Sequence, residues 1–76
     1  MTREQLHQFF KTNGWFMKPN SLAYYKDGHP TLRYKVNKLV LRKEVRLATG
    51  EWARIKSAYI SQLEIVNDKL AGMKAS

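Results

Sequence analysis

Cysteine is absent from this chain, and acidic residues are scarce, since six Asp and Glu stand against 14 Lys and Arg in 76 residues. Without cysteine there is no disulfide framework and no thiolate metal site. No apolar run approaches the roughly 18 residues that a membrane-spanning helix needs. Residues 1–10 also lack the apolar segment of a signal peptide. We therefore expect a soluble, cytoplasmic protein with one small basic domain over residues 1–76.

The residue patterns that carry catalysis or hold cofactors are missing as well. The histidines, His7 and His29, and the scattered acids form no set with metal-ligand spacing. No serine lies in a nucleophile elbow, and the isolated glycines form no phosphate-cradling loop. We therefore expect a protein that is not an enzyme, with no catalytic residue, no metal and no cofactor.

The formal net charge of +8 is large for so short a chain. Self-repulsion of this size disfavours compaction, and a bound polyanion would relieve it. Nucleic acid is the commonest such partner, and acidic proteins and anionic membranes are the others. Charge alone does not separate these classes.

The N-terminal residues predict a helix from about Thr2 to Asn13. Thr2 and Gln5 match a capping box, in which each side chain satisfies a free backbone N–H. Leu6, Phe9 and Phe10 recur at helical spacing. Gly14 is typical of a left-handed helix stop, after which Trp15 can fold back onto Phe10.

The middle of the chain predicts a three-stranded antiparallel meander. Residues 21–26 (SLAYYK) are aromatic enough for a strand, and Asp27-Gly28 is a strong hairpin signal. The next strand starts near Thr31 and returns through a two-residue turn at Asn37-Lys38 into residues 39–47.

Two interpretations of residues 51–73 remain open. Apolar residues fall every three or four positions, which favours an amphipathic helix that begins near Glu51: Trp52, Ile55, Tyr59, Leu63, Val66, Leu70 and Met73. The alternative, for residues 63–73, is a hairpin that turns at Asn67-Asp68, because Ile65, Val66 and several neighbours are better strand formers. We favour the helix. The predicted fold is then α+β, in the order α-β-β-β-α, with both helices on one face of the sheet.

Residues 31–47 alternate apolar and basic side chains. The predicted register pairs Tyr34 with Leu41 on the buried face and sets Arg33 directly opposite Arg42 on the other. Like charges paired in this way cost stability unless an anion lies between them. The candidate nucleic-acid contacts are the basic residues of this face, the neighbouring aromatic and two flanking cations at the start of the last helix: Arg33, Lys35, Arg42, Arg46, Tyr25, Arg54 and Lys56.

Each candidate also has a purely structural interpretation. The strand arginines can form an ordinary solvated face that Glu44 partly neutralises. Tyr25 can shield the sheet edge instead of stacking on a base. Glu51 weakens the case for Arg54 and Lys56 as a phosphate site.

The predicted element order, and the run Gly28-His29-Pro30 that leads into residues 32–36, resemble the double-stranded RNA-binding domain. The resemblance implies phosphate contacts from a basic cluster that opens the last helix. Residues 50–56 would form that cluster, but they carry Glu51 and Trp52 where the family has consecutive lysines. No family is assigned from the sequence.

We expect a non-enzymatic protein that binds the phosphate backbone of duplex DNA or structured RNA through the basic face of its sheet. The alternative is a protein-binding module or inhibitor, of the type found as accessory proteins of mobile elements, that docks an acidic surface of a larger partner. A homodimer through the long C-terminal helix is also open. Membrane binding is not expected, because the polar side of that helix mixes acids with cations.

Overall fold

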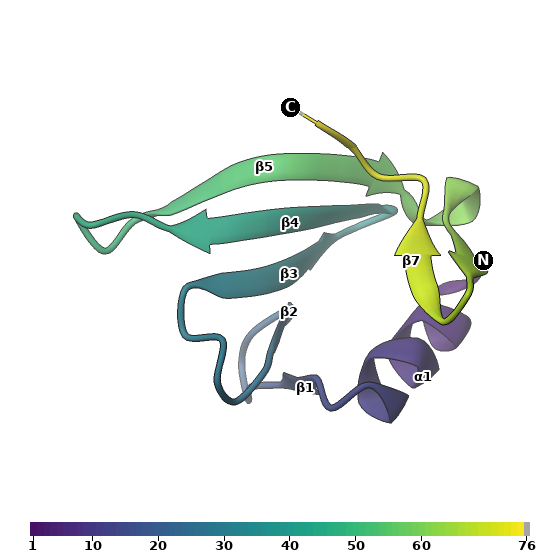
Figure 1. Cartoon of the computed structure of the whole chain (residues 1–76), viewed down its shortest axis with the longest axis horizontal. Helices are drawn as coiled ribbons and strands as arrows, with labels where there is room; N and C mark the ends of the chain where they lie inside the picture. The colour runs from purple at the N-terminus through teal and green to yellow at the C-terminus, as the bar shows by residue number, and fades with distance from the viewer. Residues whose placement is uncertain (76) are drawn as a thin grey trace.

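The computed structural model describes residues 1–75 and shows an α+β fold with one N-terminal helix (Figure 1). The elements in chain order are α1 (Arg3–Thr12), β1 (Phe16–Met17), β2 (Ala23–Tyr25), β3 (Leu32–Asn37), β4 (Val40–Arg46), β5 (Trp52–Tyr59), a 3-10 turn η1 (Ile60–Gln62), β6 (Glu64–Val66), β7 (Lys69–Ala71) and β8 (Lys74–Ala75).

The expected start and end of the first helix are confirmed. The Thr2 hydroxyl accepts a hydrogen bond from the Gln5 backbone N–H, and the Gln5 side chain accepts one from the Thr2 N–H. Gly14 has a φ of +87°, in the left-handed region. The Trp15 N–H then donates to the Phe10 carbonyl at 2.8 Å, so the chain folds back over the helix end.

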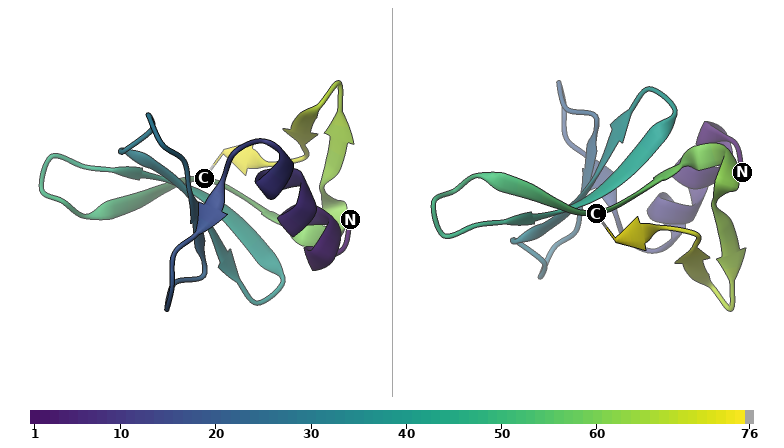
Figure 2. Two further views of the ribbon diagram at one scale, coloured as in Figure 1. Left: turned by 90° about the horizontal axis from the view of Figure 1, so that it is seen from below. Right: turned by 90° about the horizontal axis from the view of Figure 1, so that it is seen from above.

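Strands β1 to β5 form an antiparallel sheet in chain order, and the short β8 pairs with the outer edge of β5. The three central strands, β2 to β4, are the expected meander. Figure 2 shows the strong twist of the sheet and the β4–β5 hairpin that extends away from α1.

The turn between β3 and β4 lies one residue later than predicted. Asn37 pairs with Val40, so the loop residues are Lys38 and Leu39 rather than Asn37 and Lys38. Because the pairing moves by two positions, every side chain keeps its predicted face. The partners change, however, and Arg33 lies opposite Glu44 instead of Arg42.

The predicted C-terminal helix is wrong. Residues 52–59 instead form β5, which pairs with β4 over its whole length. A strand in this place satisfies backbone groups on β4 that would otherwise lie at an open sheet edge. The pairing changes register between Lys43 and Glu44, where Ile55 is the extra residue of a β-bulge.

The alternative hairpin interpretation of residues 63–73 is confirmed. Strands β6 and β7 pair through a turn at Asn67 and Asp68, which have φ angles of 51° and 61°. The α-β-β-β-α order shared with the double-stranded RNA-binding domain is therefore not present in residues 1–75. The homodimer considered above required a C-terminal helix as its interface, and residues 52–75 contain no α-helix.

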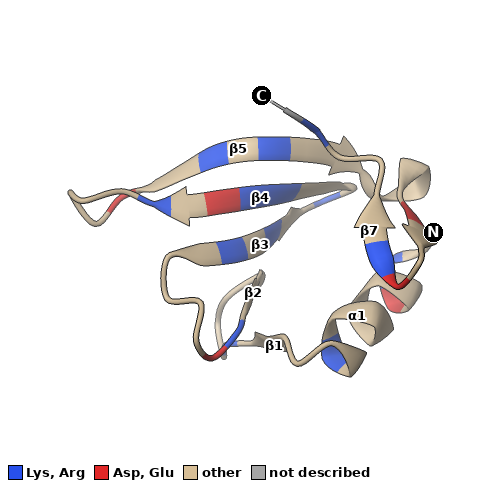
Figure 3. Cartoon of the chain, viewed as in Figure 1, with Lys and Arg blue, Asp and Glu red and all other residues tan. Residues whose placement is uncertain are grey.

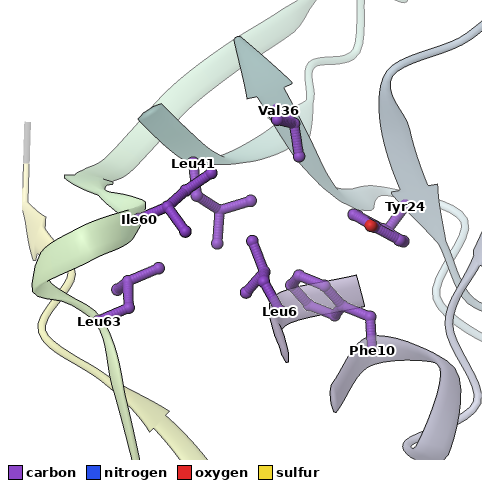
Figure 4. Close-up of a cluster of buried hydrophobic side chains, with 7 residues drawn as sticks. All are labelled: Leu6, Phe10, Tyr24, Val36, Leu41, Ile60 and Leu63. Atoms are coloured by element: carbon purple, nitrogen blue, oxygen red, sulfur yellow. The ribbon is translucent and has the colours of Figure 1, made fainter. Parts of the chain in front are cut away.

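The hydrophobic core lies between α1 and one face of the sheet (Figure 4). Leu6 and Phe10 of the helix are each 1% exposed. Around them lie buried side chains from β2, β3, β4 and the segment after β5: Tyr24, Val36, Leu41, Ile60 and Leu63. The opposite face of the sheet, called the outer face below, has no helix over it in the described chain.

Candidate functional site

The cross-strand pairs determine which side chains share the outer face, because directly opposed residues point the same way. Arg33 and Lys35 on β3 lie on the outer face, and their cross-strand partners extend it onto the neighbouring strands. The outer face carries Phe16, Tyr25, Arg33, Lys35, Arg42, Glu44, Arg46, Trp52, Arg54, Ser57 and Lys74. Figure 3 shows the basic residues along β3, β4 and β5.

One row of cross-strand partners contains cations and no acid. Lys35 on β3 lies opposite Arg42 on β4, Arg42 opposite Ser57 on β5, and Ser57 opposite Lys74 on β8. Neighbouring strands are about 4.8 Å apart, so these four positions span about 14 Å. We call this set the acid-free row.

The adjacent row contains one acid, Glu44, between Arg33 and Arg54. Its Oε1 accepts a hydrogen bond from Arg33 Nε at 2.7 Å, and its Oε2 lies 3.5 Å from Arg42 Nη2. Glu44 is only 5% exposed, although it lies on the outer face and away from the hydrophobic core. Arg54 lies opposite it on β5. One interpretation of the sequence makes the strand arginines solvated surface residues that Glu44 partly neutralises. Arg33 does pair with Glu44 in this structure.

Arg33 also connects two aromatic residues. Its Nη1 donates a hydrogen bond to the Tyr25 hydroxyl at 3.1 Å, and its guanidinium carbon lies 4.2 Å from the centroid of the Trp52 ring. Lys18 Nζ lies 4.2 Å from the Tyr25 ring centroid. This network holds Tyr25 and Trp52 in place at one end of the outer face.

The same contacts shift the ionisation of Tyr25. Burial by itself would raise the pKa of its hydroxyl, but hydrogen bonding by Arg33 and Ser21, with the positive charges of Arg33 and Lys18, lowers the pKa overall. For Arg33, burial opposes the charged form, whereas Tyr25 and Glu44 favour it and raise its pKa. Arg33 is thus a cation whose Nε and Nη1 already donate to Glu44 and Tyr25.

Arg42 is held less firmly than Arg33. Its contact with Glu44 is 0.8 Å longer, at 3.5 Å against 2.7 Å. Its Nε is buried and has no hydrogen-bond partner within the part of the chain that the structure describes. A buried donor left in this way costs stability, and an added acceptor would relieve that cost. Of the two arginines that contact Glu44, Arg42 is therefore the one better able to turn toward an anion.

A recess of about 420 Å³ adjoins the acid-free row, and Arg54, Ser57 and Lys74 are among the residues that line it. Arg54 is exposed and on the same face as the row. The recess thus adds one further cation, Arg54, to the Ser57 and Lys74 end of the acid-free row.

Lys56 lies apart from the other candidates. The prediction put Arg54 and Lys56 together at a helix start, but both are in β5 and the bulge at Ile55 separates their faces. Arg54 lies opposite Glu44, whereas Lys56 lies opposite Lys43 on the helix side. Lys56 is therefore not part of the outer face.

The remaining six predicted residues share the outer face, and Arg46 lies opposite Trp52 at its far end. Sequence reasoning missed Lys18, Trp52 and Lys74 as neighbours of this set. Trp52 was assigned to the predicted helix, and Lys74 lies in β8, a two-residue strand that has no periodicity to detect. Nothing in the sequence around Lys18 indicated its contact with Tyr25.

Within residues 1–75, no three His, Asp or Glu side chains are grouped so that they could hold a metal ion. No helix among those residues is long and apolar enough to cross a membrane.

No protein-family model matches this chain, and no curated protein sequence or solved structure is significantly similar to it.

Proposed function

We propose that this protein binds nucleic acid without catalysis, and that it contacts mainly the phosphates of duplex DNA or structured RNA through the outer face. The observation that supports this proposal most directly is the acid-free row, in which Lys35, Arg42 and Lys74 come together from three strands. These three cations repel one another, although Arg42 also lies 3.5 Å from Glu44 of the adjacent row. A row of phosphates would remove the repulsion that Glu44 leaves.

The dimensions of the row suit a nucleic-acid backbone. Each strand of a duplex carries one charge per about 3.4 Å of helix axis, so a row of about 14 Å can face several phosphates. Lysine and arginine both neutralise phosphates, and arginine adds a fork of donors that matches two phosphate oxygens. Such contacts orient the protein but carry little sequence information.

Glu44 limits which cations take part. Arg33 is closely paired with it, so Lys35, Arg42, Arg46, Arg54 and Lys74 are the main phosphate ligands in this proposal. Arg33→Gln would be a poor test, because it would leave the buried Glu44 carboxylate without its closest partner.

The test compares two triple variants with the same loss of charge. Lys35→Gln, Arg42→Gln and Lys74→Gln remove the row. The control changes Arg3, Lys11 and Lys69 to Gln, which are exposed and lie on α1 and β7. Binding to a short random-sequence duplex is measured by fluorescence anisotropy over a series of salt concentrations.

We expect the row variant to bind more weakly. The plot of log K against log salt should also become less steep by about 2.7, which is about 0.9 for each of three lost phosphate contacts. The control should keep nearly the wild-type slope. Equal losses in the two variants would mean that net charge alone attracts nucleic acid, with no interface on the outer face. A wild-type protein that does not bind duplex at low salt would remove the proposal altogether.

A further inference from the structure

A second recess, of about 300 Å³, opens where the outer face meets β1 and the loop after β2. Its lining includes the rings of Phe16, Tyr25 and Trp52. Three cations and one acid, Lys18, Lys26, Arg46 and Asp27, also line it. Aromatic rings interleaved with cations are the combination that binds unpaired nucleotides, because bases stack on the rings while the cations contact the backbone.

Phe16 is the ring most open to a ligand, since 43% of its surface is exposed. It lies opposite Tyr25 in the β1–β2 pair, so the two side chains are neighbours on one face. Tyr25 is fixed by its hydrogen bond from Arg33 and by edge contact with Trp52, whose ring centroid is 6.2 Å away. The recess is therefore formed by rings that are already in position.

The face of Tyr25 is covered by a group that can leave. Lys18 Nζ lies 4.2 Å from the ring centroid, and Lys18 is an exposed lysine at the start of a loop. An exposed contact between a lysine and an aromatic ring contributes only about 0.5–1 kcal/mol. A nucleotide can therefore displace Lys18 from the Tyr25 ring. The base then stacks on the ring, and the phosphate binds the Lys18 ammonium group.

A further aromatic recess, on the helix side of the sheet, has rings that are engaged in packing. Phe10, Trp15 and Tyr34 line it on the helix side, and their rings pack against one another with centroids 4.9 to 5.9 Å apart. Phe10 is buried in the core. Those rings are occupied by the fold itself, whereas Phe16 is not.

We infer that the recess at Phe16, Tyr25 and Trp52 binds an unpaired nucleobase. This inference rests on the proposed function and adds to it a ligand: a strand that leaves a duplex, as in a single-stranded tail or a loop. The acid-free row holds the paired region through its phosphates, and the recess takes the first free base beside it.

The test uses one duplex with three endings: blunt, with a short single-stranded tail, and with a tail of the same length whose sugars are abasic. The wild-type protein should bind the normal tail about five- to 150-fold more tightly than the abasic tail, which is the range of base stacking on an aromatic side chain. Phe16→Leu should remove most of this difference. Tyr59→Leu is the matched control, because Tyr59 is an exposed aromatic, 56% accessible, that lines the other outer-face recess.

A second measurement does not depend on a variant. Addition of a thymidine trinucleotide should shift the NMR signals of the Phe16 and Tyr25 ring protons through the ring current of a stacked base, whereas an abasic trimer should not. If normal and abasic tails bind equally well and Phe16→Leu changes neither, the inference is wrong, while salt-sensitive binding to the blunt duplex would still support the proposed function. If no ending is bound at low salt, both fail.

Discussion

Arg33 and Glu44 lie directly opposite each other on β3 and β4, and a hydrogen bond of 2.7 Å joins Arg33 Nε to Glu44 Oε1. The side chains are 16% and 6% exposed, so the pair is mostly removed from water. Glu44 also faces Arg42, which makes it the single anion between two arginines. The basic surface of this protein is therefore built around a buried acid.

Glu44→Gln should destabilise the fold. The substitution keeps the size of the side chain but leaves two arginines without a counter-charge, and loss of one partner in a buried ion pair is costly. We expect the free energy of unfolding in urea to fall by about 2–3 kcal/mol. Glu64→Gln, at an exposed position of β6, should change it by about 0.5 kcal/mol or less. Equal effects would show that the Glu44 contacts contribute no more than a surface charge.

The same variant should bind nucleic acid more tightly where it is folded. Removal of Glu44 takes the acid from between Arg33, Arg42 and Arg54 and frees their charge for phosphates. At a temperature where circular dichroism shows folded protein, anisotropy titrations should give a lower Kd for Glu44→Gln than for wild type. A higher Kd would mean that Glu44 positions the arginines for binding.

Gly72→Ala should destabilise the fold more than Gly28→Ala does. Both glycines have positive φ, +106° and +84°, where an L side chain is strained by about 1–2 kcal/mol. A Cβ at Gly72 would also lie 2.9 Å from the Gln62 backbone oxygen, whereas one at Gly28 meets nothing within 4 Å. We expect losses of about 3 and about 1 kcal/mol in urea unfolding. Equal losses would show that the chain around Gly72 moves aside freely.

Asp68→Gly should stabilise the β6–β7 hairpin. Asn67 and Asp68 both have positive φ, as in a type I′ turn, and Asn-Gly is the preferred pair there. Relief of the strain at Asp68 should raise the free energy of unfolding by about 0.5–1 kcal/mol. Asp27→Gly, in the loop after β2 where φ is not positive, is the control and should give no gain. An unchanged midpoint for Asp68→Gly would show that this hairpin unfolds before the rest of the protein.

The tyrosines should ionise in a defined order. The pKa of Tyr25 is lowered from 10.0, whereas burial raises the pKa of Tyr24 and Tyr34, with Arg3 opposing the shift at Tyr24. Tyr25 should therefore lose its proton before Tyr24 and Tyr34 when the ring Cζ signals are followed by NMR. Arg33→Gln should delay that step, since Arg33 is the main group that favours the ionised form.

These shifts also predict the sign of the pH effect on stability. Below pH 10, folded Tyr25 ionises before its unfolded counterpart, so its contribution to stability increases as the pH approaches 10. Tyr24 and Tyr34 act in the opposite direction above pH 10, where the unfolded chain ionises first. Urea unfolding of Tyr25→Phe should lack the first effect and retain the second. An identical pH profile for wild type and Tyr25→Phe would contradict the lowered pKa.

The local features of the sequence were enough to predict α1 and the central strands. The capping box and Gly14 act within a few residues of one another, so no distant contact is needed to define the helix ends. The alternation in residues 31–47 assigned Arg33, Lys35, Arg42 and Arg46 to one face correctly, because an even shift in register leaves the faces unchanged. The sequence did not show that Arg33 faces Glu44, since that depends on which residues occupy the turn.

Residues 52–71 show where the sequence was insufficient. Their apolar spacing fits a helix, and the bulge at Ile55 interrupts the alternation that would have marked β5 as a strand. Residues such as Ile65 and Val66 instead prefer strands, so local preference alone did not decide between helix and strand.

The sequence by itself determined the basic character of the chain, the N-terminal helix and the shared face of Arg33, Lys35, Arg42 and Arg46. These depend on composition and on neighbours within a few positions. Only the tertiary structure decided that the last third of the chain is β-structure, that Lys74 joins Lys35 and Arg42, and that Glu44 neutralises Arg33. Strands find their hydrogen-bond partners on segments distant in sequence, so the identity of each cross-strand neighbour exists only once the sheet has formed.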